Sequence, residues 1–194
     1  MNYLAHLFLA GDTTDSLIGN LAGDFVKGPL HDRFPPAIAD GIREHRRIDA
    51  FTDAHPSVAA FRRVLIPDHG HYARVIADVF FDHFLTCGWR SYSQAPLRDF
   101  LANVYAKIDA YPSPLPGTLA IVWPRMRDGR WLEGYGHVDN VRLALGGISR
   151  RMSRRPALES AAHHLDDSRH ELQRRFDAFF PDVVAFANAL RSRA

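Results

Sequence analysis

The sequence predicts a single all-α domain, and three observations lead to that prediction. Strand-length runs of alternating apolar and polar residues are scarce, and β-branched residues are not clustered. Segment after segment instead shows apolar residues at helical spacing, separated by stretches rich in proline and glycine. The 194 residues, 46% of them hydrophobic, suffice for one substantial core. We therefore expect one helical bundle that spans residues 1–194.

The first half of the chain is expected to form helices over residues 2–10, 14–23, 36–53 and 72–87, with short helical structure up to residue 65. Asn2 is a suitable N-cap for the first helix. Residues 27–36 are rich in glycine and proline and predict a loop. Pro56 ends the third helix, because proline cannot donate the next backbone hydrogen bond. "PDHGH" at 67–71 predicts a turn, and Gly88 favours the end of the fourth helix.

The second half is helical by the same criterion. Helices are expected over residues 95–111, 115–127, 130–135, 138–152, 156–165 and 166–190. "PSPLPG" at 112–117 interrupts the helical pattern, and Pro181 is a point at which the last helix can break.

Several classes of protein are excluded by simple features. No apolar run approaches about 18 residues, and the apolar start lacks the basic leader and cleavage site of a signal peptide. The single Cys87 excludes an internal disulfide and a cysteine-rich zinc site, and it suits a reducing compartment. No glycine-rich phosphate loop and no G-x-S-x-G motif is present. With a net charge of only +2, we expect a cytoplasmic protein that binds neither nucleic acid nor membrane.

The stretch "EHRRIDAFTDAHP", residues 44–56, carries the first candidate metal ligands. His45, Asp49 and Asp53 are spaced by four, so they climb one face of the predicted helix. Isoleucines flank that face, as they do beside a buried site in a helical bundle. A solvated or salt-bridged surface explains the same spacing equally well, so both interpretations stay open for this stretch.

The stretch "VIADVFFDHFL", residues 75–85, is more informative. Asp78, Asp82 and His83 lie on a helix that is apolar nearly all round, which indicates burial. A buried carboxylate without a partner is costly, so these acids must form a pair or bind a metal. The structural alternative is that Asp82 caps a neighbouring helix or pairs with one arginine.

Three other features have both a functional and a structural interpretation. Asp24 follows small residues that permit the close approach of a ligand, but it is also a suitable helix-end or turn residue. His6 lies on an apolar helix, where a histidine is more often a core residue with its hydrogen bonds satisfied. "AAHHLDDSRHE" at 161–171 offers metal-type ligands, but its polar surroundings favour a solvated face.

Four motifs, in this order, resemble the acyl carrier protein phosphodiesterases: "MNYLAHLFLA", "SLIGNLAGDFVKG", "HRRIDAFTDAHP" and "FDHFL". "SRRP" at 153–156 and the helical C-terminus extend the likeness over essentially the whole chain. The resemblance implies one HD-domain-like phosphohydrolase domain over 1–194, with the metal site mainly from 1–90 and supporting helices from 137–194. It also implies a hydrolase that uses Mn²⁺ or Mg²⁺ to remove 4′-phosphopantetheine from holo-acyl carrier protein.

The matched positions imply roles for individual residues. The implied metal ligands are Asp24, His45, Asp49 and Asp82, the implied catalytic residues are His83, His6 and Asp53, and Arg46 and Arg47 are implied phosphate contacts. The cations would activate water and polarise a phosphoryl oxygen, and His83 or His6 would protonate the leaving serine oxygen. The chain departs from the family pattern at Phe8, where a second histidine is usual. It also reads Asp82-His83 where an HD dyad has histidine first.

Acyl carrier proteins are acidic, so basic patches are candidate docking surfaces. One patch comprises Arg43, Arg47, Arg62 and Arg63, and the other is "SRRMSRRP" at 149–156. A merely solvated basic face explains either patch equally well. Two other functions remain open: an HD-like phosphohydrolase that acts on a nucleotide or another small phosphodiester, and a non-catalytic helical binding module. The sequence does not indicate the oligomeric state.

Overall fold

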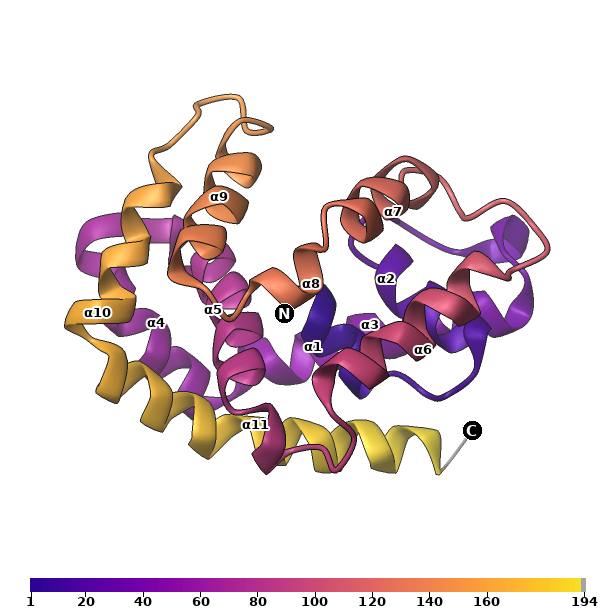
Figure 1. Cartoon of the computed structure of the whole chain (residues 1–194), viewed down its shortest axis with the longest axis horizontal. Coiled ribbons are helices and arrows are strands. Elements are labelled where there is room, and N and C mark those ends of the chain that lie inside the picture. The colour runs from indigo at the N-terminus through magenta and orange to yellow at the C-terminus, as the bar shows by residue number, and fades with distance from the viewer. Residues whose placement is uncertain (193–194) are drawn as a thin grey trace.

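The computed structural model describes residues 1–192 and confirms the all-α prediction, because this range contains eleven α-helices, four short 3₁₀-helices and no strand (Figure 1). The α-helices are α1 (Tyr3–Leu9), α2 (Thr14–Ala22), α3 (Pro36–Ala54), α4 (Pro56–His69), α5 (Ala73–Cys87), α6 (Leu97–Asp109), α7 (Leu119–Asp128), α8 (Trp131–Gly134), α9 (Val138–Ser149), α10 (His164–Asp167) and α11 (Arg169–Arg191). The 3₁₀-helices are η1 (His31–Arg33), η2 (Gly70–Tyr72), η3 (Trp89–Ser91) and η4 (Leu158–His163).

Helix α5 forms the centre of the core, as its apolar sequence predicts. Its phenylalanines at 80, 81 and 84 are fully buried, and it packs against α1, α4, α9 and α11. A helix that is apolar on every side gains stability only when other helices cover it on every side. The two acids and the histidine on α5 therefore lie among, or at the edge of, these packed helices.

Helices α2 and α3 approach each other closely because glycines face each other at their crossing. A Cβ atom on Gly19 would lie 2.5 Å from the carbonyl oxygen of Ile38 and 2.7 Å from Cα of Gly41. Only a residue without a side chain permits this backbone contact. The contact matters for the site, because it places the end of α2 against the face of α3 that carries His45.

Helix α11 runs along one side of the molecule, beneath α4, α5 and α3 in the view of Figure 1. It is continuous through Pro181, so the predicted break does not occur. A proline removes only one backbone hydrogen bond. The neighbouring Phe179, Phe180 and Val183 are fully buried, and this packing holds the helix together across the proline.

The structure also differs from two other expected boundaries. Helix α4 continues through Pro67 to His69, so most of the expected turn at 67–71 is helical. The expected helix over 156–165 is instead η4 followed by α10. This segment buries Leu158, Ala161, Ala162, His164 and Leu165.

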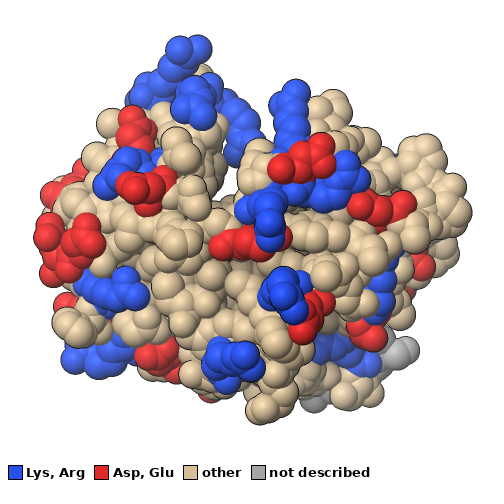
Figure 2. Space-filling model, viewed as in Figure 1, with Lys and Arg blue, Asp and Glu red and all other residues tan. Residues whose placement is uncertain are grey.

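The surface carries a notch between α9 on one side and α7 and α8 on the other (Figures 1 and 2). Lysine and arginine atoms lie on both sides of this notch in the space-filling view. Within the described residues, none of the helices combines the length and the apolar character needed to cross a membrane.

Candidate metal centre and the adjoining cleft

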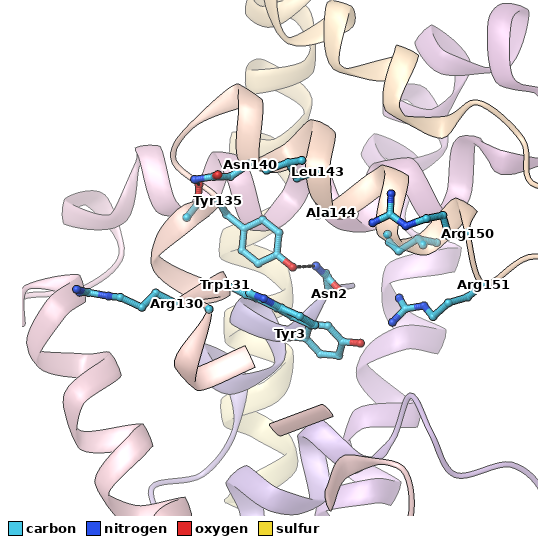
Figure 3. A pocket seen from close by; sticks show the side chains of 14 residues that line it. Asn2, Tyr3, Arg130, Trp131, Tyr135, Asn140, Leu143, Ala144, Arg150 and Arg151 are labelled. Atoms are coloured by element: carbon cyan, nitrogen blue, oxygen red, sulfur yellow. Dashed lines mark hydrogen bonds between the residues drawn. The ribbon is translucent and has the colours of Figure 1, made fainter. Parts of the chain in front are cut away.

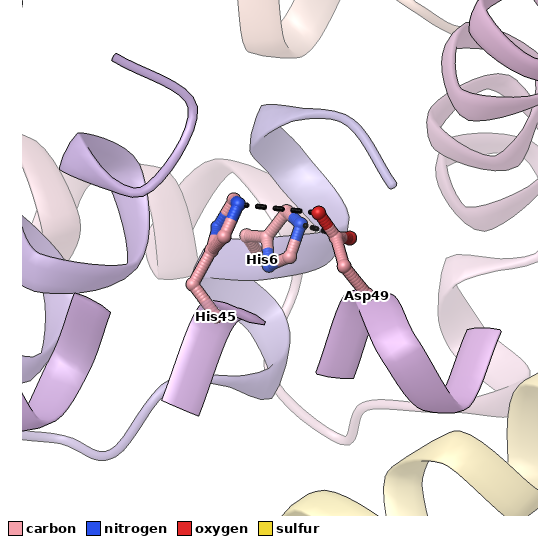
Figure 4. Close-up of side chains that lie close together, drawn as sticks. All are labelled: His6, His45 and Asp49. Atoms are coloured by element: carbon pink, nitrogen blue, oxygen red, sulfur yellow. Dashed lines mark hydrogen bonds and ion pairs between the residues drawn. The ribbon is translucent and has the colours of Figure 1, made fainter. Parts of the chain in front are cut away.

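The side chains of His6, His45 and Asp49 meet between α1 and α3 (Figure 4). One potential ligand atom from each lies within 4.8 Å of the others. His6 Nε2 lies 3.2 Å from Asp49 Oδ1, and His45 Nε2 lies 3.3 Å from Asp49 Oδ2. The two imidazole rings are stacked with their centres 3.8 Å apart. Two of the three residues lie four positions apart on α3, as expected, and the third comes from α1.

Asp24 approaches the same cluster from the segment that follows α2. Its Oδ1 lies 3.7 Å from His45 Nε2, and its side chain is one-third exposed. Burial raises the pKa of Asp24, although the neighbouring His45 acts in the opposite direction. The structure therefore brings together three of the four implied metal ligands, Asp24, His45 and Asp49, and adds His6 to them.

His45 is fixed in orientation by two features of α2. Its Nδ1 donates a 2.8 Å hydrogen bond to the carbonyl oxygen of Asn20, which leaves Nε2 directed at Asp24 and Asp49. Gly23 leaves room for the ring, because a Cβ atom there would lie 2.2 Å from His45 Cγ. A hydrogen bond from the remote ring nitrogen to a carbonyl is a common second-shell contact of metal-binding histidines.

The convergence of acceptor atoms requires a cation or a proton. A neutral His45 that carries its proton on Nδ1 presents a lone pair at Nε2, and this lone pair faces two carboxylate oxygens. Three electron-rich atoms repel one another unless a positive charge lies between them. Imidazole nitrogens with carboxylate oxygens form a donor set that suits a divalent metal such as Mn²⁺.

The surrounding groups strongly perturb the protonation of His6 and Asp49. Burial, reinforced by the neighbouring His45, lowers the pKa of His6 to about 3, so this ring is neutral near pH 7. Burial opposes ionisation of Asp49, but the adjoining rings of His45 and His6 and the nearby N-terminal ammonium hold its pKa well below the usual range. The site therefore combines neutral imidazole with ionised carboxylate, which are the forms that bind metals.

The ammonium group of Met1 also lies at this cluster. It is 2.9 Å from Asp49 Oδ1 and 3.4 Å from Asp78 Oδ1, and it is buried. Burial opposes its charge, but the two aspartates raise the pKa of the amine to about 11. This ion pair explains Asp78, one of the acids that the sequence placed on the apolar helix α5.

Asp82 does not join the cluster, in contrast to the implied ligand set. Its Oδ2 accepts a 2.9 Å hydrogen bond from the backbone N–H of Leu4, and its Oδ1 accepts one of 2.9 Å from Ala5. Both are first-turn N–H groups of α1, so Asp82 caps that helix. Asn2, the expected cap, instead donates to the hydroxyl of Tyr135. Burial raises the pKa of Asp82 to about 7, although the two N–H groups oppose this.

His83 also lies away from the cluster. Its Nδ1 is 2.7 Å from the carbonyl oxygen of Tyr135, and its Nε2 is 3.5 Å from a guanidinium nitrogen of Arg169. Burial lowers the pKa of this ring. Of the two histidines expected to transfer a proton, only His6 is at the cluster.

Two of the remaining implied residues, Asp53 and Arg46, line a hollow of about 380 Å³ beside the cluster. Its other lining residues include Asp24, His45, Asp49 and Arg74. Asp53 is held by Arg62 at 2.8 Å and by Arg74 at 2.6 Å. Arg46 donates to the carbonyl oxygens of residues 26 and 28 and so anchors the loop after Asp24. Arg47 is exposed on the outer face of α3.

Phe8 occupies the position where the family pattern has a second histidine. It packs against Trp89, Phe100 and Phe180, with ring centres 5.3, 6.3 and 5.7 Å away. The side chain belongs to an aromatic cluster and not to the group of ligands. This position therefore contributes packing in the present chain.

A second cavity, of about 360 Å³, lies in the notch and was not expected from the sequence (Figure 3). Asn2 and Tyr3 line it from α1, Trp131 and Tyr135 from the region of α8, and Arg150 and Arg151 from the end of α9. The cavity adjoins the cluster through the chain, because Asn2 directly follows Met1. In the sequence, only the consecutive Arg150 and Arg151 and the nearby Trp131 point to this cleft, and neither feature is specific without the fold. In the structure, Trp131 is 37% exposed.

Comparisons with known proteins identify the family of the chain. Residues 1–183 match the family model described as "Acyl carrier protein phosphodiesterase". Proteins named acyl carrier protein phosphodiesterase from Salmonella dublin and Salmonella agona are each 35% identical to the chain over 188 residues, which covers 96% of this chain and 97% of each relative. No solved structure matches, so the kinship with HD-domain phosphohydrolases stays a prediction. The chain belongs to the acyl carrier protein phosphodiesterase family.

Proposed function

We propose that this member of the acyl carrier protein phosphodiesterase family hydrolyses the phosphodiester that links 4′-phosphopantetheine to holo-acyl carrier protein, with a divalent cation at the cluster between α1 and α3. The observation that carries the proposal is the convergence of the ligand atoms of His6, His45 and Asp49 beside an open hollow. The names of the relatives support the carrier protein as the substrate.

His6, His45 and Asp49 would hold the cation, and Asp24 would complete the set from the rim. His6 thus takes the place that the resemblance gave to Asp82. A bound Mn²⁺ or Mg²⁺ would supply Lewis acidity toward the phosphoryl oxygen and lower the pKa of a water molecule. The hydrogen bond to the Asn20 carbonyl orients the His45 ring toward the cation, and Gly23 leaves room for the ring in this orientation.

The arginines divide into structural and substrate-facing groups. Arg46 uses its guanidinium to anchor the loop that follows Asp24, so it positions that carboxylate. Arg74 lines the hollow, and its side chain is 61% exposed although it pairs with Asp53. We assign to Arg74 the contact with phosphate oxygens that the resemblance gave to Arg46 and Arg47. Asp53 would position Arg74 through their ion pair and would not itself contact the substrate.

The basic rim of the cleft is the better of the two predicted docking surfaces. Arg150 and Arg151 line the cleft, and no arginine of 149–156 lies in a salt bridge within the described part of the chain. In the other patch, Arg43 pairs with Asp40, and Arg62 pairs with Asp53. Guanidinium groups that form no salt bridge and lie beside a concave surface suit an acidic carrier protein, and this attraction weakens as salt rises.

The test is to incubate metal-stripped protein with holo-acyl carrier protein and to follow the mass of the carrier by mass spectrometry. After Mn²⁺ is added, the carrier protein should again lose the mass of phosphopantetheine. Rising salt should raise KM for the carrier protein. Full activity in the presence of chelator would exclude the cation. Turnover of nucleotides without turnover of holo-carrier would favour the general phosphohydrolase, and a protein that binds no metal would favour the binding module.

A further inference from the structure

A second group of potential metal ligands lies where the end of α4 meets η4 and α10, at the edge of the molecule that carries the label α10 in Figure 1. Ligand atoms of Asp68, His163 and His164 lie within 4.8 Å of one another. Asp68 Oδ2 is 3.2 Å from His164 Nε2 and 4.0 Å from His163 Nε2. The two histidine rings lie with their centres 4.0 Å apart.

His164 is buried without the hydrogen bonds that a buried imidazole normally makes. Its side chain is only 6% exposed, and neither ring nitrogen has a hydrogen-bond partner among the described residues. The 3.2 Å approach to Asp68 lacks the alignment of a hydrogen bond. The neighbouring His69, whose ring centre is 5.4 Å from that of His164, also has a buried Nε2 without a partner in this part of the chain. Buried polar atoms are rarely left unpaired unless an ion or a water molecule completes them.

His163 is oriented in the same way as His45 in the first cluster. Its Nδ1 donates a 2.6 Å hydrogen bond to the carbonyl oxygen of Ser160, which leaves Nε2 on the side of Asp68. The side chains of His163 and Asp68 are about half exposed, at 47% and 55%, so an ion has access from solvent.

We propose that Asp68, His163 and His164 bind a second divalent cation of the zinc class, with His69 as an adjacent third imidazole. Imidazole nitrogens with one carboxylate suit Zn²⁺, Co²⁺ or Ni²⁺ better than Mg²⁺ or Ca²⁺. The cation would join the end of α4 to the segment that leads into α11, two parts of the chain far apart in sequence. The preference for a solvated face at 161–171 holds for Asp166, Asp167 and His170, which are exposed, but not for the buried His164.

This inference uses no residue of the first cluster and does not rest on the proposed function. Its test is equilibrium dialysis of the metal-stripped full chain against Zn²⁺, with the bound metal counted by elemental mass spectrometry and the melting temperature measured in parallel. The test variant is Asp68→Asn/His163→Gln, because both side chains are half exposed and their replacement leaves the core intact. The matched control is Asp166→Asn/His170→Gln, which removes one acid and one histidine from the exposed face of the same segment.

The wild type and the control are expected to bind one more Zn²⁺ per chain than the test variant. Zn²⁺ should also raise the melting temperature of the wild type and the control more than that of the test variant. Long-range ¹H–¹⁵N spectra of the histidine rings should show shifts for His163 and His164 as this equivalent binds. Equal zinc content in all three proteins, or unchanged ring signals of His164 at saturation, would overturn the proposal.

Discussion

The cluster between α1 and α3 and the polar residues of α5 resemble each other in sequence but differ in the folded protein. Both place a carboxylate and a histidine near apolar positions of one helix, and both were implied as parts of one active site. At the first, His45 and Asp49 turn toward His6 and Asp24, and their acceptor atoms face one another. At the second, both oxygens of Asp82 are occupied by backbone N–H groups of α1.

The difference shows what burial of a carboxylate does and does not imply. Burial requires partners, but the partners need not be metal ions. Asp82 is satisfied by two backbone donors, so it stabilises the fold. Asp49 is surrounded by imidazoles and an ammonium, which are groups that a cation can replace or join. Four predictions test this contrast.

The largest effect is expected for Asp49→Asn. The amide loses the charge that attracts the cation, so phosphodiesterase activity on holo-carrier protein should fall about 100-fold or more, because losing merely a partner that orients a ligand already costs about 10- to 100-fold. Steady-state kinetics at saturating Mn²⁺ measure the loss. The matched control is Asp40→Asn on the same helix, whose side chain is 73% exposed and, among residues 1–192, pairs only with Arg43. A variant with near-normal kcat would remove Asp49 from the site.

Gly23→Ala should have the second largest effect. The new Cβ atom would lie 2.2 Å from His45 Cγ and would force the ring out of its position. We expect metal affinity to fall by about 10- to 100-fold, as it does when the support of a ligand is disturbed. Isothermal titration with Mn²⁺ measures the affinity. Gly146→Ala is the control, because its Cβ atom would make only ordinary van der Waals contacts, with a side-chain nitrogen of Arg150 at 3.5 Å and with two side-chain atoms of Glu159 at 3.9 Å. Equal affinities for the two variants would contradict the role of Gly23.

Asp82→Asn should change stability and leave metal binding intact. The amide nitrogen would face one of the two N–H donors of α1, and an unsatisfied buried donor costs about 1–3 kcal/mol of unfolding free energy. Urea denaturation measures this loss, and Mn²⁺ titration of the folded variant measures the affinity. If Asp82 were a ligand, the affinity would fall sharply while the unfolding free energy changed little.

The smallest effect is a contrast in the pH dependence of stability in metal-free protein. The pKa of Asp82 rises from 3.8 to about 7 on folding, so the folded state retains a proton that the unfolded chain releases. The contribution of Asp82 to the unfolding free energy therefore falls as the pH rises from 3.8 to about 7. The pKa of His6 falls from 6.5 to about 3, so the unfolded chain binds the extra proton and stability increases as pH rises through that window.

The measurement is the unfolding free energy between about pH 4 and pH 6.5, where both windows overlap. Subtracting the values for Asp82→Asn from the wild type should leave a difference that decreases with pH. Subtracting those for His6→Asn should leave one that increases. Two differences with slopes of the same sign would show that the two regions do not differ in the way described.

The features that the sequence determined by itself are those that depend on the local spacing of apolar residues. The helical fold, the burial of α5 and the common face of His45 and Asp49 all depend on the 3.6-residue repeat, which acts over a few residues. The order of the motifs also identified the family, which the comparisons confirm. These properties depend on neighbours in the chain, and the chain itself specifies them.

Only the tertiary structure decided which buried polar groups share partners. Asp82 meets the first turn of α1 from 77 and 78 residues away, and His6 meets Asp49 from 43 residues away. His164 reaches Asp68 only because η4 and α10 pack against the end of α4. A metal ligand, a helix-capping acid and a core histidine have the same local signature in the sequence, because each is a polar side chain among apolar neighbours. The donor or acceptor that an opposing helix brings to it determines its role, and the packing of distant helices alone fixes that partner.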